Sequence, residues 1–133
     1  MSGVATQSNV ERAEALYRAF ARGNFESVTE GMTEDVTWIE AEGAPYGGTY
    51  IGPESVVDHV FTPLAEDWTE FHVVTERFVD GGDVVVVTGT YRGTHATTDR
   101  RFEAPFAHVL TMRDGKLARF EQYTDTYLVR QAV

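Results

Sequence analysis

The sequence contains no cysteine, a single lysine (Lys116) and only four histidines. The absence of cysteine excludes disulfides, and the scattered histidines cannot assemble the usual ligand spacing of a zinc site, so we expect no metal. No apolar run approaches the roughly 18 residues of a membrane span, and no basic-then-apolar segment opens the chain. We therefore expect a cytoplasmic protein without a membrane partner.

Basic residues are also scarce. The chain has 11 lysines and arginines and 21 acidic residues, which gives a formal net charge of −10. Such a surface repels phosphate backbones, so nucleic acid is not an expected partner. An acidic, lysine-poor composition is typical of proteins from salt-loving or GC-rich organisms. The alternative is an ordinary solvated acidic surface, and neither interpretation bears on catalysis.

The length of 133 residues allows one hydrophobic core, since a chain of this size buries roughly two-thirds of its unfolded surface. Hydrophobic residues make up 42% of the chain and aromatic residues 12%, which is typical of a globular protein. Residues 1–8 are small and polar and show no periodicity. We predict a flexible amino terminus over 1–8 and a single domain over 9–133.

The first half of the chain shows helical spacing of apolar residues. The spacing predicts a helix over 9–22, capped by Ser8 or Asn9, then a short helix over 25–32. Residues 36–40 are β-branched and aromatic, which favours a strand, and 42–52 form a glycine-rich loop. Pro53 opens a third helix that runs to Trp68.

Everything after Trp68 favours strands, over 70–79, 84–93, 101–113 and 116–127. Asp114-Gly115 is a strong hairpin signal, and we pair Arg113 with Lys116 across it. Helices followed by a run of antiparallel strands predict an α+β fold, without the alternation that builds a parallel sheet. The sequence shows no internal repeat and no linker.

The phrases GNFESV, EGMTEDVTW, YIGPESV, VVVVTGTYRGTH and RDGKLARFEQYTD, in this order of elements, resemble the SnoaL-like polyketide cyclase family. That family belongs to the nuclear-transport-factor-2-like superfamily, together with ketosteroid isomerase. The resemblance spans residues 9–128. It implies a cone-shaped, curved antiparallel or mixed sheet packed on three N-terminal helices, an apolar pocket, and a homodimer formed through the outer face of the sheet.

The resemblance also implies positions for catalytic groups. Glu40 falls where ketosteroid isomerase carries its general base, and Tyr17 falls near its oxyanion donor. Such an enzyme needs a carboxylate whose pKa is raised by an apolar cavity and a donor for the developing enolate. The alternatives are that Glu40 is a solvated residue at a strand end and that Tyr17 is a core aromatic.

Two other family positions have lost their carboxylates. The second aspartate of the isomerase falls at Ala107, and the acid/base aspartate of the SnoaL cyclases falls at Gln122, which cannot transfer a proton at neutral pH. Asp125 is the nearest replacement carboxylate, or else it caps the end of the last strand.

A regular hairpin from Arg113 and Lys116 sets Ala107 opposite Gln122 and His108 opposite Glu121, unless a bulge intervenes. His108 is then either a pH-tuned base or, as we favour, a partner of Glu121 at a dimer surface. For the ligand-binding wall we predict, from bulky, polar and aromatic residue types, Phe20, Trp38, Phe61, Tyr91, Phe106, His108, Phe120 and Gln122.

These observations favour a pocket for a small apolar, carbonyl-containing or polycyclic molecule. The protein is then a cofactor-free isomerase, cyclase or lyase that acts by acid–base catalysis, with Glu40 or Asp125 as base and Tyr17 or Gln122 as donor. The rival interpretation is a non-catalytic binding or dimerisation domain of the same fold, which Ala107 and Gln122 favour.

Overall fold

The computed structural model describes residues 7–133. The helices are α1 (Asn9–Ala21), α2 (Phe25–Glu30), α3 (Pro53–Val56), the π-helical turn η1 (Val57–Phe61), α4 (Thr62–Asp67) and α5 (Thr126–Arg130). The strands are β1 (Met32–Glu40), β2 (Gly48–Ile51), β3 (Trp68–Gly81), β4 (Val84–His95), β5 (Arg101–Arg113) and β6 (Lys116–Thr124). The order confirms the predicted α+β class.

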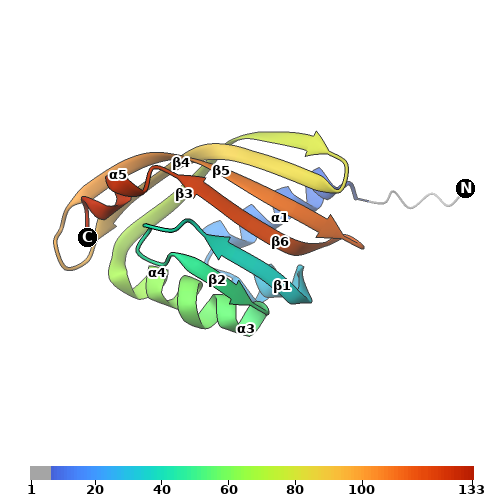
Figure 1. Ribbon diagram of the computed structural model, residues 1–133, viewed down its shortest axis with the longest axis horizontal. Coiled ribbons are helices and arrows are strands. Elements are labelled where there is room, and N and C mark those ends of the chain that lie inside the picture. The colour runs from blue at the N-terminus through green and yellow to red at the C-terminus, as the bar shows by residue number, and fades with distance from the viewer. Residues whose placement is uncertain (1–6) are drawn as a thin grey trace, which may run out of the picture.

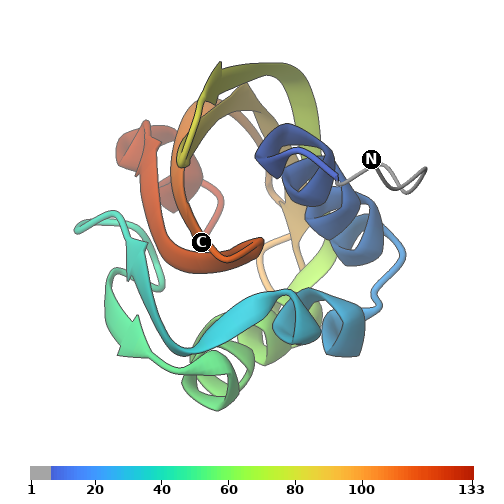
Figure 2. The same ribbon diagram turned by 90° about the vertical axis from the view of Figure 1, so that its right-hand side faces the viewer.

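The strands form one six-stranded sheet in the order β2-β1-β6-β5-β4-β3 (Figure 1). The hairpins β3–β4, β4–β5 and β5–β6 are antiparallel, whereas β1 pairs with β6 in parallel. The sheet curls strongly, and α1 with the α3–η1–α4 segment lies within the curve (Figure 2). Helix α1 packs on β3 and β4, α4 packs on β3, and α3 packs on β1 and β2.

Strand β3 carries an extra residue opposite Gly89 and Thr88 of β4. Thr75 pairs with Gly89 and Arg77 pairs with Thr88, so Glu76 bulges out of the ladder. A Cβ atom on Gly89 would lie 2.1 Å from the carbonyl oxygen of Val74 and 2.7 Å from the ring of Phe106. Glycine is therefore required here because the backbones of β3 and β4 approach too closely for any side chain.

Helix α1 begins with the cap that the sequence predicts. The Ser8 hydroxyl accepts from the Glu11 amide at 3.1 Å, and the Glu11 carboxylate accepts from the Ser8 amide at 3.0 Å. This reciprocal pair satisfies two amide groups that the first turn leaves without partners. Most of the segment predicted to be flexible, 1–8, lies outside the described residues.

Several elements differ from the predictions. The helix predicted over 25–32 ends at Glu30, and the strand predicted over 36–40 begins already at Met32. The predicted loop 42–52 contains β2, which pairs with β1 from Glu40↔Gly48 to Thr37↔Ile51. The third helix contains the π-helical turn η1, where an extra residue widens one turn. The strand predicted over 116–127 ends at Thr124, because the Asp125 side chain accepts from the Leu128 amide at 3.2 Å and starts α5.

The register predicted for the last hairpin is wrong beyond its first pairs. Thr111 pairs with Arg119 and Met112 with Leu117, so Ala118 is an extra residue in β6. One inserted residue moves all later pairs by one position, which transfers side chains to the opposite face of the strand. His108 consequently lies opposite Gln122 rather than Glu121. His108 itself belongs to the buried face of β5 and is 3% exposed rather than at a surface.

We predict that Gly89→Ala destabilises the fold by about 2 kcal/mol, as overpacking at a fixed backbone contact does. The measurement is the midpoint of urea unfolding. Thr88→Ala, on the neighbouring residue, is the matched control and should cost less than about 1 kcal/mol. An equal loss in both variants would contradict the close-approach explanation.

Candidate functional site

A cavity of about 90 Å³ lies between the concave face of the sheet and the helices. Its wall is almost entirely apolar, and every element from α1 to α5 except β2 and α3 contributes to it. The lining residues are Leu16, Tyr17, Phe20, Val28, Trp38, Glu40, Ala44, Pro45, Tyr46, Val60, Phe61, Leu64, Trp68, Phe71, Val73, Tyr91, His108, Leu110, Leu117, Phe120, Gln122, Thr124 and Val129.

Aromatic rings shape one side of the cavity. Trp38 of β1 stacks on Phe120 of β6 with ring centroids 3.7 Å apart, at a pair of positions that the parallel β1–β6 ladder sets side by side. Phe61 meets Trp38 edge-on at 5.4 Å and Phe20 at 5.4 Å. This packing holds flat apolar surfaces in fixed orientations along the cavity wall.

Glu40 is a carboxylate buried in this apolar wall. It lies two residues after Trp38 on β1, so both side chains point to the same face. The Trp38 indole Nε1 donates to Glu40 Oε2 at 2.9 Å, and residues 7–133 provide Glu40 with no other hydrogen-bond donor. Glu40 is 5% exposed. Burial therefore raises the pKa of Glu40 to about 7, and the indole hydrogen bond opposes only part of that rise.

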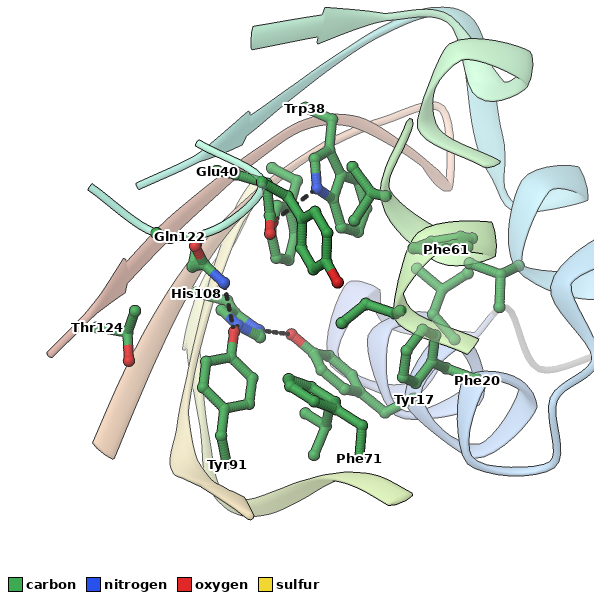
Figure 3. A pocket seen from close by; sticks show the side chains of 18 of the residues that line it. Tyr17, Phe20, Trp38, Glu40, Phe61, Phe71, Tyr91, His108, Gln122 and Thr124 are labelled. Atoms are coloured by element: carbon green, nitrogen blue, oxygen red, sulfur yellow. Dashed lines mark hydrogen bonds between the residues drawn. The ribbon is translucent and has the colours of Figure 1, made fainter. Parts of the chain in front are cut away.

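A second polar group is centred on His108 of β5. Its Nδ1 lies 2.6 Å from the Tyr17 hydroxyl of α1, and its Nε2 is hydrogen-bonded to the Tyr91 hydroxyl of β4. The Gln122 amide of β6 donates to the Tyr91 hydroxyl at 2.9 Å (Figure 3). The Ala118 bulge makes this arrangement, because it brings Gln122 opposite His108 on the cavity side.

The groups in the His108 cluster are electrically neutral. Burial lowers the pKa of His108 to about 3, so its imidazole is uncharged at neutral pH. Burial also raises the pKa of the Tyr17 and Tyr91 hydroxyls, which therefore keep their protons. The cavity thus combines one carboxyl group that titrates near neutrality with a row of neutral hydrogen-bonding groups.

The loop between β1 and β2 closes the cavity through Tyr46. The Tyr46 hydroxyl donates to Asp67 Oδ2 at 2.8 Å and accepts from Trp68 Nε1 at 3.1 Å. The Tyr50 hydroxyl donates to the Tyr46 carbonyl at 2.8 Å. These contacts tie the loop to the junction of α4 and β3, so it forms a fixed part of the wall.

Most of the side chains predicted for the site line this one cavity. They are Tyr17, Phe20, Trp38, Glu40, Phe61, Tyr91, His108, Phe120 and Gln122. In Figure 3, Glu40 and Trp38 lie on one side of the group, and Tyr17 and Phe20 lie on the other. The preferred role of His108 as a surface partner of Glu121 is wrong, since the alternation of β5 places His108 on the buried face and the bulge in β6 brings Gln122 opposite it.

Two predicted residues lie elsewhere. Phe106 is buried behind the wall, where its ring stacks on Tyr91 at 4.5 Å and on His108 at 4.2 Å. Asp125 is exposed and caps α5, so it does not face the cavity. The alternative role considered for Asp125, a cap, is the one that the structure supports.

Sequence reasoning missed the loop residues Ala44, Pro45 and Tyr46, and Val129 of α5. An aromatic residue between a proline and two glycines is the one signal that could have drawn attention to the loop, because a solvated turn seldom needs one. Val129 gave no such signal, since it lies beyond the strand predicted over 116–127 and no element was predicted there.

Within residues 7–133 no three histidine, aspartate or glutamate side chains gather closely enough to hold a metal ion. No helix in that range has both the length and the apolar character needed to cross a membrane.

Comparisons with known proteins agree with this architecture. The model of the SnoaL-like domain family matches residues 13–120. An NTF2-like protein of Burkholderia thailandensis is 33% identical, with 96% of this chain and 98% of that chain covered and a TM-score of 0.92. TerC, co-crystallised with polyporic acid, is 29% identical over 93% of this chain and 96% of that chain, with a TM-score of 0.84.

A structure from a Jannaschia species, assigned as a SnoaL-like polyketide cyclase, shares the fold at 21% identity, with 98% and 97% of the two chains covered and a TM-score of 0.82. No curated protein matches the sequence significantly. The curved-sheet α+β fold places this chain in the NTF2-like class of proteins. Within that class, this chain belongs to the SnoaL-like domain family.

We predict that Glu40 makes stability depend on pH. Its pKa is about 7 in the folded protein and about 4.5 without burial, so the folded state binds the proton more tightly. The free energy of unfolding should therefore fall as pH rises from about 4.5 to 7, by roughly 3 kcal/mol from this group.

In Glu40→Gln this decline should be absent. The free energy of unfolding of the variant, relative to that of the wild type, should therefore increase by roughly 3 kcal/mol over the same pH interval. Urea unfolding at a series of pH values measures the difference in unfolding free energy between the variant and the wild type. His108 contributes a pH dependence of opposite sign, but both proteins contain it, so its contribution cancels in the difference. Glu42→Gln, at an exposed position in the following loop, is the control. A difference between Glu40→Gln and wild type that does not change with pH would contradict the burial of a titrating carboxyl.

Proposed function

We propose that this protein takes a small apolar carbonyl compound into the cavity and moves a proton at the carbon next to the carbonyl, with Glu40 as the base. The observation that carries the proposal is a carboxyl group enclosed by apolar side chains, with a pKa of about 7. A base with a pKa near the working pH combines a useful fraction of the ionised form with a strong drive to take the proton.

The proposed step is a simple proton transfer. An oxygen of the ionised Glu40 carboxylate takes a proton from the α-carbon, the C–H electron pair becomes the C=C bond of an enolate, and the carbonyl π electrons move to oxygen. Glu40 then holds the proton and returns it to the same or another carbon. Isomerisation, cyclisation and elimination of carbonyl compounds can all begin with this step, which needs no cofactor because the carboxylate itself carries the proton.

The contact from Trp38 supports the role of Glu40. The indole engages only Oε2 at 2.9 Å, so the side chain is held in place while Oε1 keeps its acceptor capacity. The stacked pair Trp38 and Phe120 adds a flat apolar surface next to the carboxyl group. The similarity to TerC, which was co-crystallised with polyporic acid, supports a ligand in this kind of fold.

The homodimer expected from the resemblance stays a prediction. Val74 and Val79, on the outer side of β3, are 37% and 41% exposed, which fits pairing through that face of the sheet.

We predict that the wild-type protein accelerates exchange of the α-protons of 1-indanone with solvent deuterium, and that Glu40→Gln reduces the rate by about 10²- to 10⁴-fold, as loss of a general base does. Exchange is measured by proton NMR in heavy water, which detects the enolate step whatever reaction follows it. Glu42→Gln should exchange at the wild-type rate.

If Glu40→Gln retains the wild-type rate, Glu40 is not the base. If 1-indanone raises the melting temperature of the wild-type protein without any exchange, the chain is a binding domain rather than an acid–base enzyme.

We also predict the pH dependence of the exchange. Only the ionised carboxylate can accept a proton, so kcat/KM should rise tenfold per pH unit below about pH 7 and level off above it. The profile is measured with 1-indanone at subsaturating concentration. An inflection near pH 4.5, the ordinary value for glutamate, would contradict a base buried in this cavity.

A further inference from the structure

Four polar side chains from four different elements form one continuous row of hydrogen bonds in the cavity wall. The row runs from Gln122 of β6 through Tyr91 of β4 and His108 of β5 to Tyr17 of α1 (Figure 3). Hydroxyl and neutral imidazole groups both donate and accept, so such a row has two directions in principle. Contacts at its Gln122 end select one of them.

The direction is set by the backbone amide of Ala41, immediately after β1. This N–H donates to Gln122 Oε1 at 2.9 Å, so the carbonyl side of the Gln122 amide must face β1. The NH₂ side, which can only donate, then faces Tyr91 at 2.9 Å. A flipped amide would set two donors against each other at Ala41 and is therefore excluded.

Tyr91 consequently accepts from Gln122 and has its own hydrogen to place. Within residues 7–133 the Tyr91 hydroxyl has one other partner, His108 Nε2. In either direction of the row one hydroxyl hydrogen, that of Tyr91 or that of Tyr17, has no acceptor within the row. Tyr91 is 4% exposed whereas Tyr17 is only partly buried, so an unpaired hydrogen is less unfavourable on Tyr17. Tyr91 therefore donates to Nε2, which must be the unprotonated nitrogen of the imidazole.

His108 is enclosed by Tyr17, Tyr91, Phe106 and Phe120, and within residues 7–133 no carboxylate hydrogen-bonds or ion-pairs with it to stabilise a positive charge. In the neutral ring, an acceptor at Nε2 requires the hydrogen at Nδ1. Nδ1 therefore donates to the Tyr17 hydroxyl, 2.6 Å away. Tyr17 accepts this bond, and its own hydrogen is left for the cavity that it lines.

We propose that Gln122 and His108 are positioning residues that direct the Tyr17 O–H into the cavity, where it binds a hydrogen-bond acceptor oxygen of the ligand. A carbonyl oxygen fits this site, and an enolate oxygen fits it better because charge strengthens the bond. The inference rests on the proposed function in one respect, namely that this oxygen belongs to the carbonyl whose α-proton Glu40 removes. The direction of the row itself does not depend on any reaction.

The row of hydrogen bonds also explains why an amide rather than a carboxylate suits position 122. An ionised carboxylate at this position could only accept, so it would take the hydrogen of Tyr91. His108 would then donate from Nε2 and accept at Nδ1, and the Tyr17 hydrogen would be consumed inside the row. The amide is thus the group that keeps a donor available to the ligand.

The first test is the tautomer of His108 in the ligand-free protein, read from long-range ¹⁵N–¹H correlations at pH 8. Replacement of His59, His72 and His95 by glutamine leaves His108 as the one histidine to be observed. We expect the Nδ1–H tautomer, and we expect Gln122→Glu to convert it to the Nε2–H tautomer. Gln131→Glu makes the same change at an exposed position and should leave the tautomer as in the wild type.

The second test compares 1-indanone with indane, which has the same ring system without the oxygen. We expect the wild type to bind 1-indanone about tenfold more tightly than indane, as one hydrogen bond provides, and both Tyr17→Phe and Gln122→Glu to abolish that preference. Gln131→Glu should retain it. Affinities are measured by titration of the intrinsic tryptophan fluorescence.

An Nε2–H tautomer in the wild-type protein would overturn the proposal, and so would a preference for 1-indanone that survives in Tyr17→Phe. A Gln122→Glu variant that keeps the Nδ1–H tautomer would overturn the role of Gln122. If the tautomer and the preference are as expected while 1-indanone shows no α-proton exchange, the positioning role stands and the proton-transfer function fails.

Discussion

The extra residue in β6, Ala118, is the constraint on which the site depends. A strand alternates its side chains between two faces, so one inserted residue exchanges the faces for everything beyond it. Because of this bulge, Phe120 and Gln122 face the cavity, and Gln122 lies opposite His108. A regular hairpin would have directed Glu121 toward the interior, where an unpaired carboxylate next to His108 would have changed the charge of the whole wall.

Desolvation shifts the pKa values of two groups in one cavity in opposite directions. It disfavours the charged form of each, which raises the pKa of Glu40 to about 7 and lowers that of His108 to about 3. Glu40 is consequently able to exchange a proton near neutral pH, whereas His108 remains a neutral link between two tyrosines. The same physical effect in one cavity thus leaves Glu40 able to titrate near neutrality and keeps His108 neutral.

Membership of the SnoaL-like domain family accounts for the scaffold and leaves the chemistry to individual residues. The curved sheet, the closing helices and the loop held by Tyr46 define an enclosed apolar space. Glu40 retains a carboxylate at a position that the resemblance had marked. Gln122 differs from the aspartate expected there, and in our proposal its amide is what leaves the Tyr17 hydrogen for the cavity.

The sequence by itself determined the class of fold, the helices 9–22 and 53–68, the long strands and the apolar character of the site, because these follow from local periodicity, turn residues and composition. It also indicated Glu40 and Tyr17 through the family resemblance. Only the tertiary structure decided the roles of His108 and Asp125. The Ala118 bulge places Gln122 rather than Glu121 opposite His108, and a capping bond makes Asp125 the start of a helix, and neither event leaves a periodic signal in the chain. The direction of the hydrogen-bond row likewise required the fold, since it is set by a contact between Ala41 and Gln122, 81 residues apart in the sequence.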